Sequence, residues 1–327
     1  MLLERYFKGW ISPRTLSRLG VLGINARNFR YIQRYNPRDA YPLVDDKVLT
    51  KEIVLERQLK TPTIYAVLTK QYEVAHFHKR IADYPEFVIK PAHGSGGNGI
   101  LVISGRQGED YIKASGAILS RSHVERHLSN ILAGLHSLGG QPDQAIIEYR
   151  IHPHPFFENF SFQGVPDIRV LVFLGFPVMA MMRLSTRGSD GKANLHQGAI
   201  GVGIDVKSGN PIRAVQRNRP ITVHPDTNEP LSNLRIEGWQ TLIETAAECY
   251  PATNLGYMGV DLVVDEKHGP MILEMNARPG LSIQLANGHG LRPRLKRVES
   301  FLRESSRHPA PKDCVAMAQS WFGTDLE

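Results

Sequence analysis

Apolar residues along the chain occur mostly in short runs that predict strands, and polar segments with helical periodicity separate these runs. Two of the runs are expected to form a hairpin that turns at Gly175. Strands are predicted within 59–68, after a turn, and at 87–90, 100–103, 145–151, 168–174, 177–183, 258–264 and 271–275. This irregular alternation of strands and helices favours an α+β fold over a doubly wound parallel sheet.

The helical segments have recognisable starts and stops. The first 45 residues or so are expected to form short helices broken by turns. Asp45-Asp46 supplies an N-cap for a helix that begins at Lys47. Further helices are predicted at 76–82, at about 114–138 with Gly139-Gly140 as the stop, at about 232–249, and in most of the tail from about 290.

Length and composition narrow the class of protein. A chain of 327 residues has room for two or three lobes. No apolar run approaches the ~18 residues that span a bilayer, and the start lacks the apolar block of a signal peptide. The two cysteines, Cys249 and Cys314, form neither a metal-ligand spacing nor a disulfide framework. A reducing, cytoplasmic location is therefore expected, with Cys249 as a small buried apolar residue.

The net charge of +7 is compatible with nucleic acid or with a polyanionic small molecule such as ATP as a ligand. Lys and Arg are spread along the chain, and the one dense run, 292–297, lies where a helix with a solvated face is expected. No strand resembles an RNA-recognition motif and no helix-turn-helix stands out. The sequence therefore argues against a nucleic-acid partner.

A glycine-rich segment, Gly94-Ser-Gly-Gly-Asn-Gly99, follows a strand that ends in Lys90. The spacing matches a dinucleotide-binding fingerprint, but the segment leads into a strand at Ile100 rather than a helix. A P-loop would need Gly-Lys-Ser/Thr here, and a protein kinase places its lysine after the loop. Strand, lysine, glycine hairpin and strand remain, an arrangement that can fold backbone N–H groups over phosphates. An ordinary glycine-rich hairpin is the alternative.

Polar residues interrupt two apolar strands near the end of the chain. Asp261 lies on one strand, and alternation places Glu274 and Asn276 on a common face of the next. Three oxygen donors of this kind suit Mg²⁺ that is shared with substrate phosphates. The alternative is a sheet edge with solvated polar residues.

These segments occur in the order found in the ATP-grasp superfamily. The chain resembles the RimK-related α-L-glutamate ligases, and most closely the α-L-glutamate ligase-like branch, over residues 45–285. The resemblance implies that two lysines and a flexible loop hold the ATP phosphates, namely Lys47, Lys90 and the loop Gly94, Ser95, Gly96, Gly97, Asn98 and Gly99. It also implies that further residues contact the nucleotide, namely the hinge residues Glu148, Tyr149 and Ile151 that border adenine, and Asp167.

The resemblance implies the remaining site residues as well. Three arginines take catalytic roles, Arg169, Arg183 and Arg278. A substrate-side loop presents Lys192, Asn194 and His196, and the metal triad is Asp261, Glu274 and Asn276. The cofactors implied are ATP and one or two Mg²⁺ ions, for which Mn²⁺ can substitute.

The resemblance implies a division into lobes that differs from that of typical family members at the N-terminal end. A short helical segment at 1–45 precedes a first lobe at 46–147 and a second at 148–288, and a helical tail occupies 289–327. The N-terminal segment is too short for the usual α/β lobe, so part of the substrate platform is expected to be replaced. Glutamate specificity does not follow from the sequence.

The implied function is an ATP-dependent carboxylate–amine ligase that forms an amide bond through an acyl phosphate and releases ADP and phosphate. The carboxylate substrate would be an amino acid or a peptide, and an amine is the acceptor. A phosphotransferase on the same fold and a non-catalytic nucleotide-binding module are the alternatives. The sequence leaves the oligomeric state open, a homodimer included.

Overall fold

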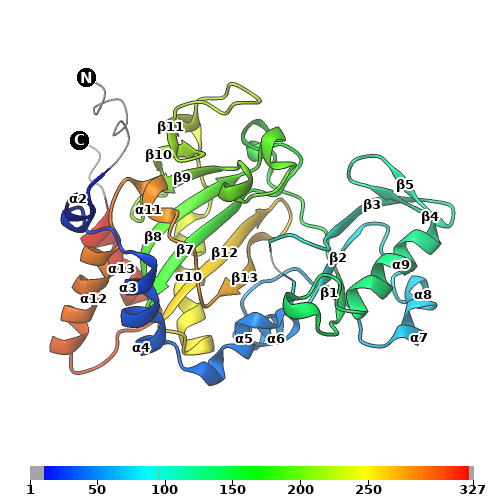
Figure 1. Ribbon diagram of the computed structural model, residues 1–327, viewed down its shortest axis with the longest axis horizontal. Helices are drawn as coiled ribbons and strands as arrows, with labels where there is room; N and C mark the ends of the chain where they lie inside the picture. Colours follow the sequence, from blue (N-terminus) through cyan, green and yellow to red (C-terminus); the bar gives the residue numbers. More distant parts are fainter. Residues whose placement is uncertain (1–10, 95, 324–327) are drawn as a thin grey trace.

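The chain folds around two antiparallel sheets (Figure 1). The computed structural model describes residues 11–94 and 96–323. The smaller sheet has six strands in the order β1-β6-β2-β3-β4-β5. Their bounds are β1 Ile64–Leu68, β2 Phe87–Pro91, β3 Leu101–Gln107, β4 Asp110–Lys113, β5 Ile118–Leu119 and β6 Ala145–Glu148. The predicted α+β class is confirmed.

The larger sheet has seven strands in the order β11-β10-β9-β8-β7-β12-β13. Their bounds are β7 Asp167–Phe173, β8 Phe176–Leu184, β9 Ile200–Ile204, β10 Pro211–Gln216, β11 Arg219–Ile221, β12 Tyr257–Asp265 and β13 Gly269–Asn276. The predicted hairpin is β7–β8, and it turns at Leu174 and Gly175, which both have positive φ. The two acidic strands are neighbours in register, β12 and β13.

Helices pack against both sheets and connect the strands. Those before Lys47 are α2 Pro13–Arg18, α3 Ile24–Ala26, the π-helix η1 Arg27–Ile32, α4 Gln33–Tyr35, the 3-10 helix η2 Arg38–Ala40 and α5 Pro42–Asp45. The others are α6 Lys47–Glu56, α7 Gln71–Val74, α8 Phe77–Arg80, α9 Arg121–Leu132, α10 Trp239–Thr253, α11 Ile283–Asn287, α12 Arg292–Glu304 and α13 Pro311–Phe322. Short 3-10 turns lie at Leu138–Gly140, Pro155–Phe160, Arg187–Ser189, Leu195–Gln197 and Leu231–Asn233.

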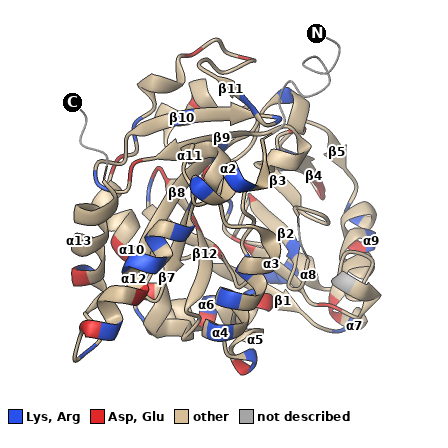
Figure 2. Ribbon diagram, turned by 60° about the vertical axis from the view of Figure 1, so that its left-hand side comes forward, with Lys and Arg blue, Asp and Glu red and all other residues tan. Residues whose placement is uncertain are grey.

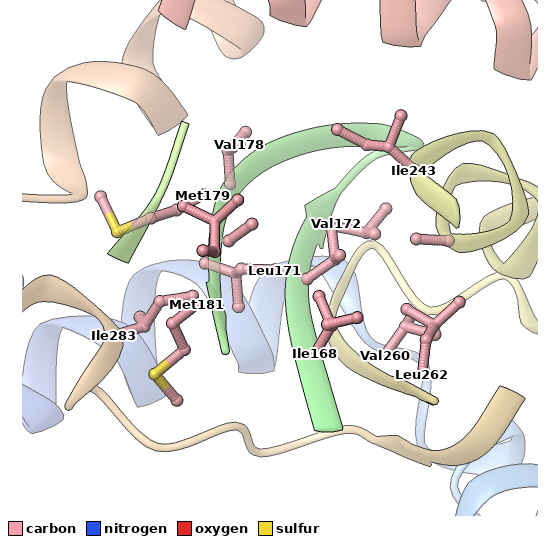
Figure 3. Close-up of a cluster of buried hydrophobic side chains, with 14 of the residues drawn as sticks. Ile168, Leu171, Val172, Val178, Met179, Met181, Ile243, Val260, Leu262 and Ile283 are labelled. Carbon is pink, nitrogen blue, oxygen red and sulfur yellow. The ribbon is translucent and has the colours of Figure 1, made fainter. Parts of the chain in front are cut away.

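The main hydrophobic core lies against the larger sheet. Strand alternation sends Ile168 and Val172 of β7 to the face covered by α10, where Figure 3 shows Ile243. Leu171 and Met181 point to the other face, toward Ile283 of α11 (Figure 3). Full burial of each such side chain contributes roughly 1.5–3 kcal/mol. The prediction that Cys249 is a buried apolar residue is confirmed, and the side chains of Met179, Met181 and Met182 of β8 are buried as well.

The smaller sheet has a hydrophobic cluster of its own. Phe87 and Ile89 of β2 pack with Val124 and Leu128 of α9, and all four are fully buried. α9 thereby covers one face of the smaller sheet. This sheet contains β2 and β3, the two strands that flank the glycine-rich loop. The loop is therefore attached to a rigid support at both ends.

Two helix predictions were wrong in their bounds. The segment expected to be helical from about 114 contains the turn around Gly116 and strand β5, and the helix begins only after Ser120, whose side chain caps it. The helix ends at Leu132, shortly before Gly134, which has a φ of +83° and whose added Cβ would lie 2.3 Å from the carbonyl oxygen of Gln141. The helix expected at 232–249 begins at Trp239, because Gly238 has a φ of +68°. In both segments glycine backbone conformation overrides helical periodicity.

None of the helices in the described ranges is long and apolar enough to cross a membrane. Figure 2 shows Lys and Arg on α2, α4, α12 and around β2, so the net charge of +7 is distributed over several elements.

The predicted N-cap of the helix that begins at Lys47 is confirmed. Asp46 accepts hydrogen bonds from the backbone N–H groups of Val48 and Leu49, at 2.7 and 3.4 Å. We expect Asp46→Ala to lower the free energy of unfolding by about 1 kcal/mol, since the backbone N–H groups of Val48 and Leu49 lose their acceptor. Asp45→Ala is the matched control because Asp45 is exposed and caps nothing. Denaturant unfolding measures both, and equal effects of the two substitutions would contradict the capping role.

Candidate functional site

A line of charged side chains crosses four strands of the larger sheet. The register pairs Asp167 of β7 with Arg183 of β8, and Arg169 of β7 with Asp261 of β12. Asp261 is in turn paired with Glu274 of β13. Because residues that are paired across neighbouring strands share a face, these five side chains lie on the face opposite α10. We refer to these five residues as the polar row.

The polar row is joined by charge-assisted hydrogen bonds. Arg169 donates to both carboxylate oxygens of Asp261, at 2.7 Å from Nε and 2.6 Å from Nη2. Arg183 donates to Asp261 Oδ2 at 2.7 Å and also forms a bidentate pair with Asp167. Both aspartates are buried. The predicted catalytic residue Arg169 is therefore bonded to one carboxylate, and Arg183 is bonded to two.

The surroundings shift the pKa values of Asp167 and Asp261 in opposite directions. Burial raises the pKa of Asp167, and the nearby charge of Asp261 adds to the increase against the pull of Arg183. Burial also disfavours ionisation of Asp261, but Arg169 and Arg183 outweigh it and lower the pKa of this carboxyl. Asp261 is therefore firmly ionised at neutral pH.

The predicted metal residues meet at one end of the β12–β13 ladder. Asn276 is paired with Gly259, two positions along from the pair formed by Asp261 and Glu274, so all three predicted ligands share a face. Asp261 Oδ1 accepts one hydrogen bond, which leaves it a lone pair, and Asn276 Oδ1 accepts from the backbone N–H of Arg278 at 2.8 Å. The half-buried Glu274 carboxylate makes no hydrogen bond or ion pair within residues 11–94 and 96–323.

This donor set fits a divalent cation. Two carboxylates and an amide oxygen are hard ligands of the kind that Mg²⁺ takes together with water and phosphate oxygens. Within the described chain no cluster of three or more His, Cys, Asp or Glu side chains is arranged to hold a metal. The triad is compatible with this finding because only two of its members are carboxylates.

The predicted lysine Lys90 lies in a buried cluster of three charges. Its Nζ atom is 2.7 Å from Glu148, and the other carboxylate oxygen of Glu148 is 3.0 Å from Nζ of Lys51. Lys51 also donates to Thr61 at 3.1 Å and to the carbonyl of Pro62. One glutamate thus neutralises one of two lysines, and the cluster retains a charge of +1. Glu148 was predicted as a hinge residue near adenine, and the structure shows its side chain holding both lysines.

Lys47 connects this cluster to the polar row. Its Nζ atom donates to the carbonyls of Ala92 and Gly94, at 3.2 and 2.7 Å, and therefore lies beneath the start of the glycine-rich loop. Burial lowers the pKa of Lys47, Glu274 opposes this effect, and Lys90 adds to it. Helix α6, which begins at Lys47, packs against β13, the strand that carries Glu274. The residues predicted to bind phosphate and metal are thus brought together.

The glycine-rich loop is fixed at its two ends and open in its middle. A Cβ at Gly94 would lie 2.3 Å from Pro91, and one at Gly99 would lie 2.6 Å from the ring of His136. His127 contacts the carbonyl oxygen of Gly99 at 3.0 Å. Gly96 and Gly97 have φ values of +65° and +79° and open space around them. The exposed Asn98 lies in this middle part, and Ser95 lies outside the described residues.

Other predicted residues lie farther from this group of charges. Tyr149 and Ile151 follow the end of β6, and the Tyr149 hydroxyl donates to Asp265 at 3.1 Å. In the substrate-side loop the Asn194 side chain accepts from the backbone N–H of His196, which caps a short turn. No hydrogen bond or ion pair in the described chain joins Lys192, Asn194 or His196 to the polar row.

Two contributors were missed from the sequence. Lys51 lies one helical turn after Lys47 on α6, and this spacing was the only signal for it. Asp143 anchors the start of the glycine-rich loop, since it contacts His93 Nδ1 at 2.7 Å and accepts from the His93 backbone N–H at 3.1 Å. Nothing in the local sequence marks Asp143, because its partner comes from a distant strand end.

The buried Lys51 predicts a pH dependence of stability. Burial lowers the pKa of Lys51 to about 8, with Lys90 adding to the effect and Glu148 opposing it. Above pH 8 the folded state has released a proton that the unfolded chain keeps until about pH 10.5. The unfolded state then binds more protons, so the stability contributed by Lys51 rises with pH across this window. The free energy of unfolding of the wild type, minus that of Lys51→Met, should therefore increase from pH 8 to 10; a flat or falling difference would contradict this.

Comparison with known proteins gives one family and several distant structures. A family model described as sugar-transfer associated ATP-grasp matches residues 26–300. No curated protein matches the chain. The D-cycloserine synthetase DcsG is 14% identical with a TM-score of 0.45, over 86% of this chain and 79% of that one. D-alanine–D-alanine ligase from Bacillus anthracis, complexed with ATP, is 17% identical with a TM-score of 0.44, over 81% and 67%.

The ATP-grasp ligase PsnB, complexed with a minimal precursor, is 13% identical with a TM-score of 0.43, over 88% of this chain. The chain spans 63% of the length of PsnB. Likenesses at these levels of identity and TM-score say nothing about the reaction.

Proposed function

The chain belongs to the sugar-transfer associated ATP-grasp family, and from this premise we propose that it is an ATP-dependent carboxylate–amine ligase that releases ADP and phosphate. One observation carries the proposal. Lys47 donates to the carbonyl of Gly94 in the glycine-rich loop at 2.7 Å, and the helix that it begins, α6, packs against β13, the strand that carries Glu274. Within the described residues Glu274 forms no hydrogen bond or ion pair. In this proposal residues 46–147 and 148–288 form the two lobes that grip the nucleotide.

The cations and the loop would bind the triphosphate. Among the described residues the Lys47 ammonium group donates to two carbonyl oxygens and to no carboxylate, so its charge is available to a phosphate. The cluster of Lys51, Glu148 and Lys90 adds a further positive charge, which the ion pairs with Glu148 hold in place. Gly96 and Gly97 leave room for backbone N–H groups to approach phosphate oxygens. Closure of this loop would exclude water from a hydrolysable acyl phosphate.

Asp261, Glu274 and Asn276 would hold Mg²⁺, which neutralises charge on the β- and γ-phosphates when bound. Arg169 and Arg183 fix the position and ionisation of Asp261 through the bonds described above. We assign them this positioning role. Arg278, whose guanidinium has no carboxylate partner in the described chain, is the arginine assigned to the substrate.

The proposed reaction has two steps, formation of an acyl phosphate and attack on it by an amine. An oxygen of the substrate carboxylate forms a bond to the γ-phosphorus, and the bond to the β-phosphate oxygen breaks to release ADP. The lone pair of an amine nitrogen then bonds to the acyl carbon, phosphate leaves with the electron pair of its C–O bond, and the nitrogen loses a proton. A cation beside the acyl oxygen stabilises the charge of the tetrahedral intermediate. We propose an amino acid or peptide as the carboxylate, and glutamate specificity of the RimK-related kind remains a prediction.

Hydroxylamine trapping tests this function without knowledge of the natural amine. The protein is incubated with Mg·ATP, hydroxylamine and single candidates from a panel of free amino acids, short dicarboxylates and peptides. We expect ADP and a carboxylate-dependent hydroxamate, followed by nucleotide chromatography and mass spectrometry. AMP in place of ADP would contradict the proposal. A stable phosphorylated product formed without hydroxylamine would indicate a phosphotransferase, and nucleotide binding without turnover a non-catalytic module.

A further inference from the structure

A cavity of about 450 Å³ lies where the N-terminal helices meet the turn after β13. The residues around it come from η1, α4, η2, the start of α5 and the turn, namely Asn28, Ile32, Gln33, Asn36, Arg38, Tyr41 and Arg278. Its volume falls in the range of about 300–1,000 Å³ typical of small-molecule sites. A π-helix forms one wall, and such segments are rare and frequently lie at functional sites.

The cavity is held rigidly against the polar row. Asn36 donates to the carbonyls of Tyr257 and Ala277 at 2.8 and 3.1 Å, and it accepts from the Tyr257 N–H at 2.8 Å. Arg27 donates to the carbonyl of Pro279 at 2.7 Å. A Cβ at Gly259 would lie 2.8 Å from Pro279 and 3.7 Å from Arg169 Nε, so the turn covers the same face as the polar row.

The charges around the cavity are all positive. Arg38 and Arg278 line it, and neither forms an ion pair with an acidic side chain in the described chain. No acidic residue is among the lining residues. The Arg278 guanidinium lies 4.8 Å from the centre of the Tyr41 ring, which holds it in place without neutralising it. The exposed Gln33 makes no side-chain hydrogen bond within residues 11–94 and 96–323, so its amide is free to contact a ligand.

We infer that this cavity binds the substrate whose carboxylate the enzyme activates, with Arg38 and Arg278 as its carboxylate-binding residues. The inference rests on the proposed function. The backbone N–H of Arg278 is bonded to the predicted metal ligand Asn276, so the cavity opens beside the place where the γ-phosphate would lie. Guanidinium groups bind carboxylates through paired N–H donors, and the Tyr41 ring offers a flat apolar wall. In this inference the short N-terminal helices supply part of the substrate platform.

The test compares Arg38→Ala with Arg34→Ala, an exposed arginine of α4 that lines a different cavity. Ligands are drawn from the same panel of amino acids and short dicarboxylates, with inorganic phosphate as a separate arm. We expect the carboxylate that gives hydroxamate to bind about 10- to 100-fold more weakly to Arg38→Ala, with an equal rise in its KM. The KM for ATP should stay close to wild type in both variants, and Arg34→Ala should also keep the wild-type kcat. Arg38→Lys should recover part of the affinity, since lysine restores the positive charge but lacks the paired N–H donors of the guanidinium group.

The outcomes separate this inference from the proposed function. Hydroxamate formation with an unchanged carboxylate KM in Arg38→Ala would overturn the cavity as the substrate site and leave the ligase reaction intact. Carboxylate-induced thermal stabilisation that is lost in Arg38→Ala but kept in Arg34→Ala, without any hydroxamate, would support the site and overturn the reaction. Phosphate that stabilises the protein through Arg38 when no carboxylate does so would overturn the assignment of a carboxylate ligand.

Discussion

Glu274→Gln should lower ADP-forming turnover by about 10²- to 10³-fold, the scale on which the loss of one group that stabilises transition-state charge acts. Glutamine keeps the shape of the side chain and removes the negative charge that faces Lys47. Glu274 has no hydrogen-bond partner in the described chain, so the substitution leaves no buried group unpaired. The thermal unfolding midpoint without nucleotide should therefore stay close to wild type. Initial rates of ADP release at saturating Mg·ATP measure the effect.

Glu266→Gln is the matched control. Glu266 is an exposed glutamate at the opposite end of the same β12–β13 hairpin, and only its backbone N–H is engaged, by the carbonyl of His152. Its substitution should change neither turnover nor stability. Full turnover in Glu274→Gln would remove Glu274 from the reaction and with it the observation on which the proposed function depends.

The position of Glu274 could be predicted because a strand has a period of two. Apolar runs around Asp261 and Glu274 define β12 and β13, and alternation alone puts Glu274 and Asn276 on one face. The structure adds the register that pairs Asp261 with Glu274. The sequence order of Lys90 and the glycine-rich segment likewise predicted strand, loop and strand, which β2 and β3 confirm.

The partners of these residues could not be predicted in the same way. Asp167, Arg169 and Arg183 are neighbours of Asp261 only through the order β8-β7-β12, which no local pattern encodes. The same holds for Lys51, whose partner Glu148 lies at the end of β6. Sequence reasoning therefore assigned Arg169 and Arg183 to the reacting groups, whereas in the structure both are bound to carboxylates.

The N-terminal helices show a further limit of local patterns. Their short lengths were predicted, but the cavity they form depends on Asn36, which bonds to backbone groups of Tyr257 and Ala277. An asparagine in a helical segment gives no sign of such distant acceptors. Arg38 is an exposed arginine like many others in the sequence, and only its place opposite Arg278 distinguishes it.

The second large effect is expected for Arg183→Met, which should lower the free energy of unfolding by about 3–5 kcal/mol. Asp167 is buried, and Arg183 is its only hydrogen-bond donor among the side chains of the described chain. Methionine fills much of the same volume but leaves this carboxylate without a counter-ion, and it also removes one donor from Asp261. Denaturant titration of the wild type and the variant measures the loss.

A double variant, Arg183→Met with Asp167→Leu, separates the two roles open to Arg183. It removes the buried pair completely, and replacing a buried ion pair by apolar residues is often neutral or stabilising. Asp261 keeps both bonds from Arg169 in this variant. We therefore expect the double variant to regain most of the lost stability and a large part of the ADP-forming turnover. If its stability returns while turnover stays as low as in Glu274→Gln, Arg183 acts on the reacting groups and the positioning role is wrong.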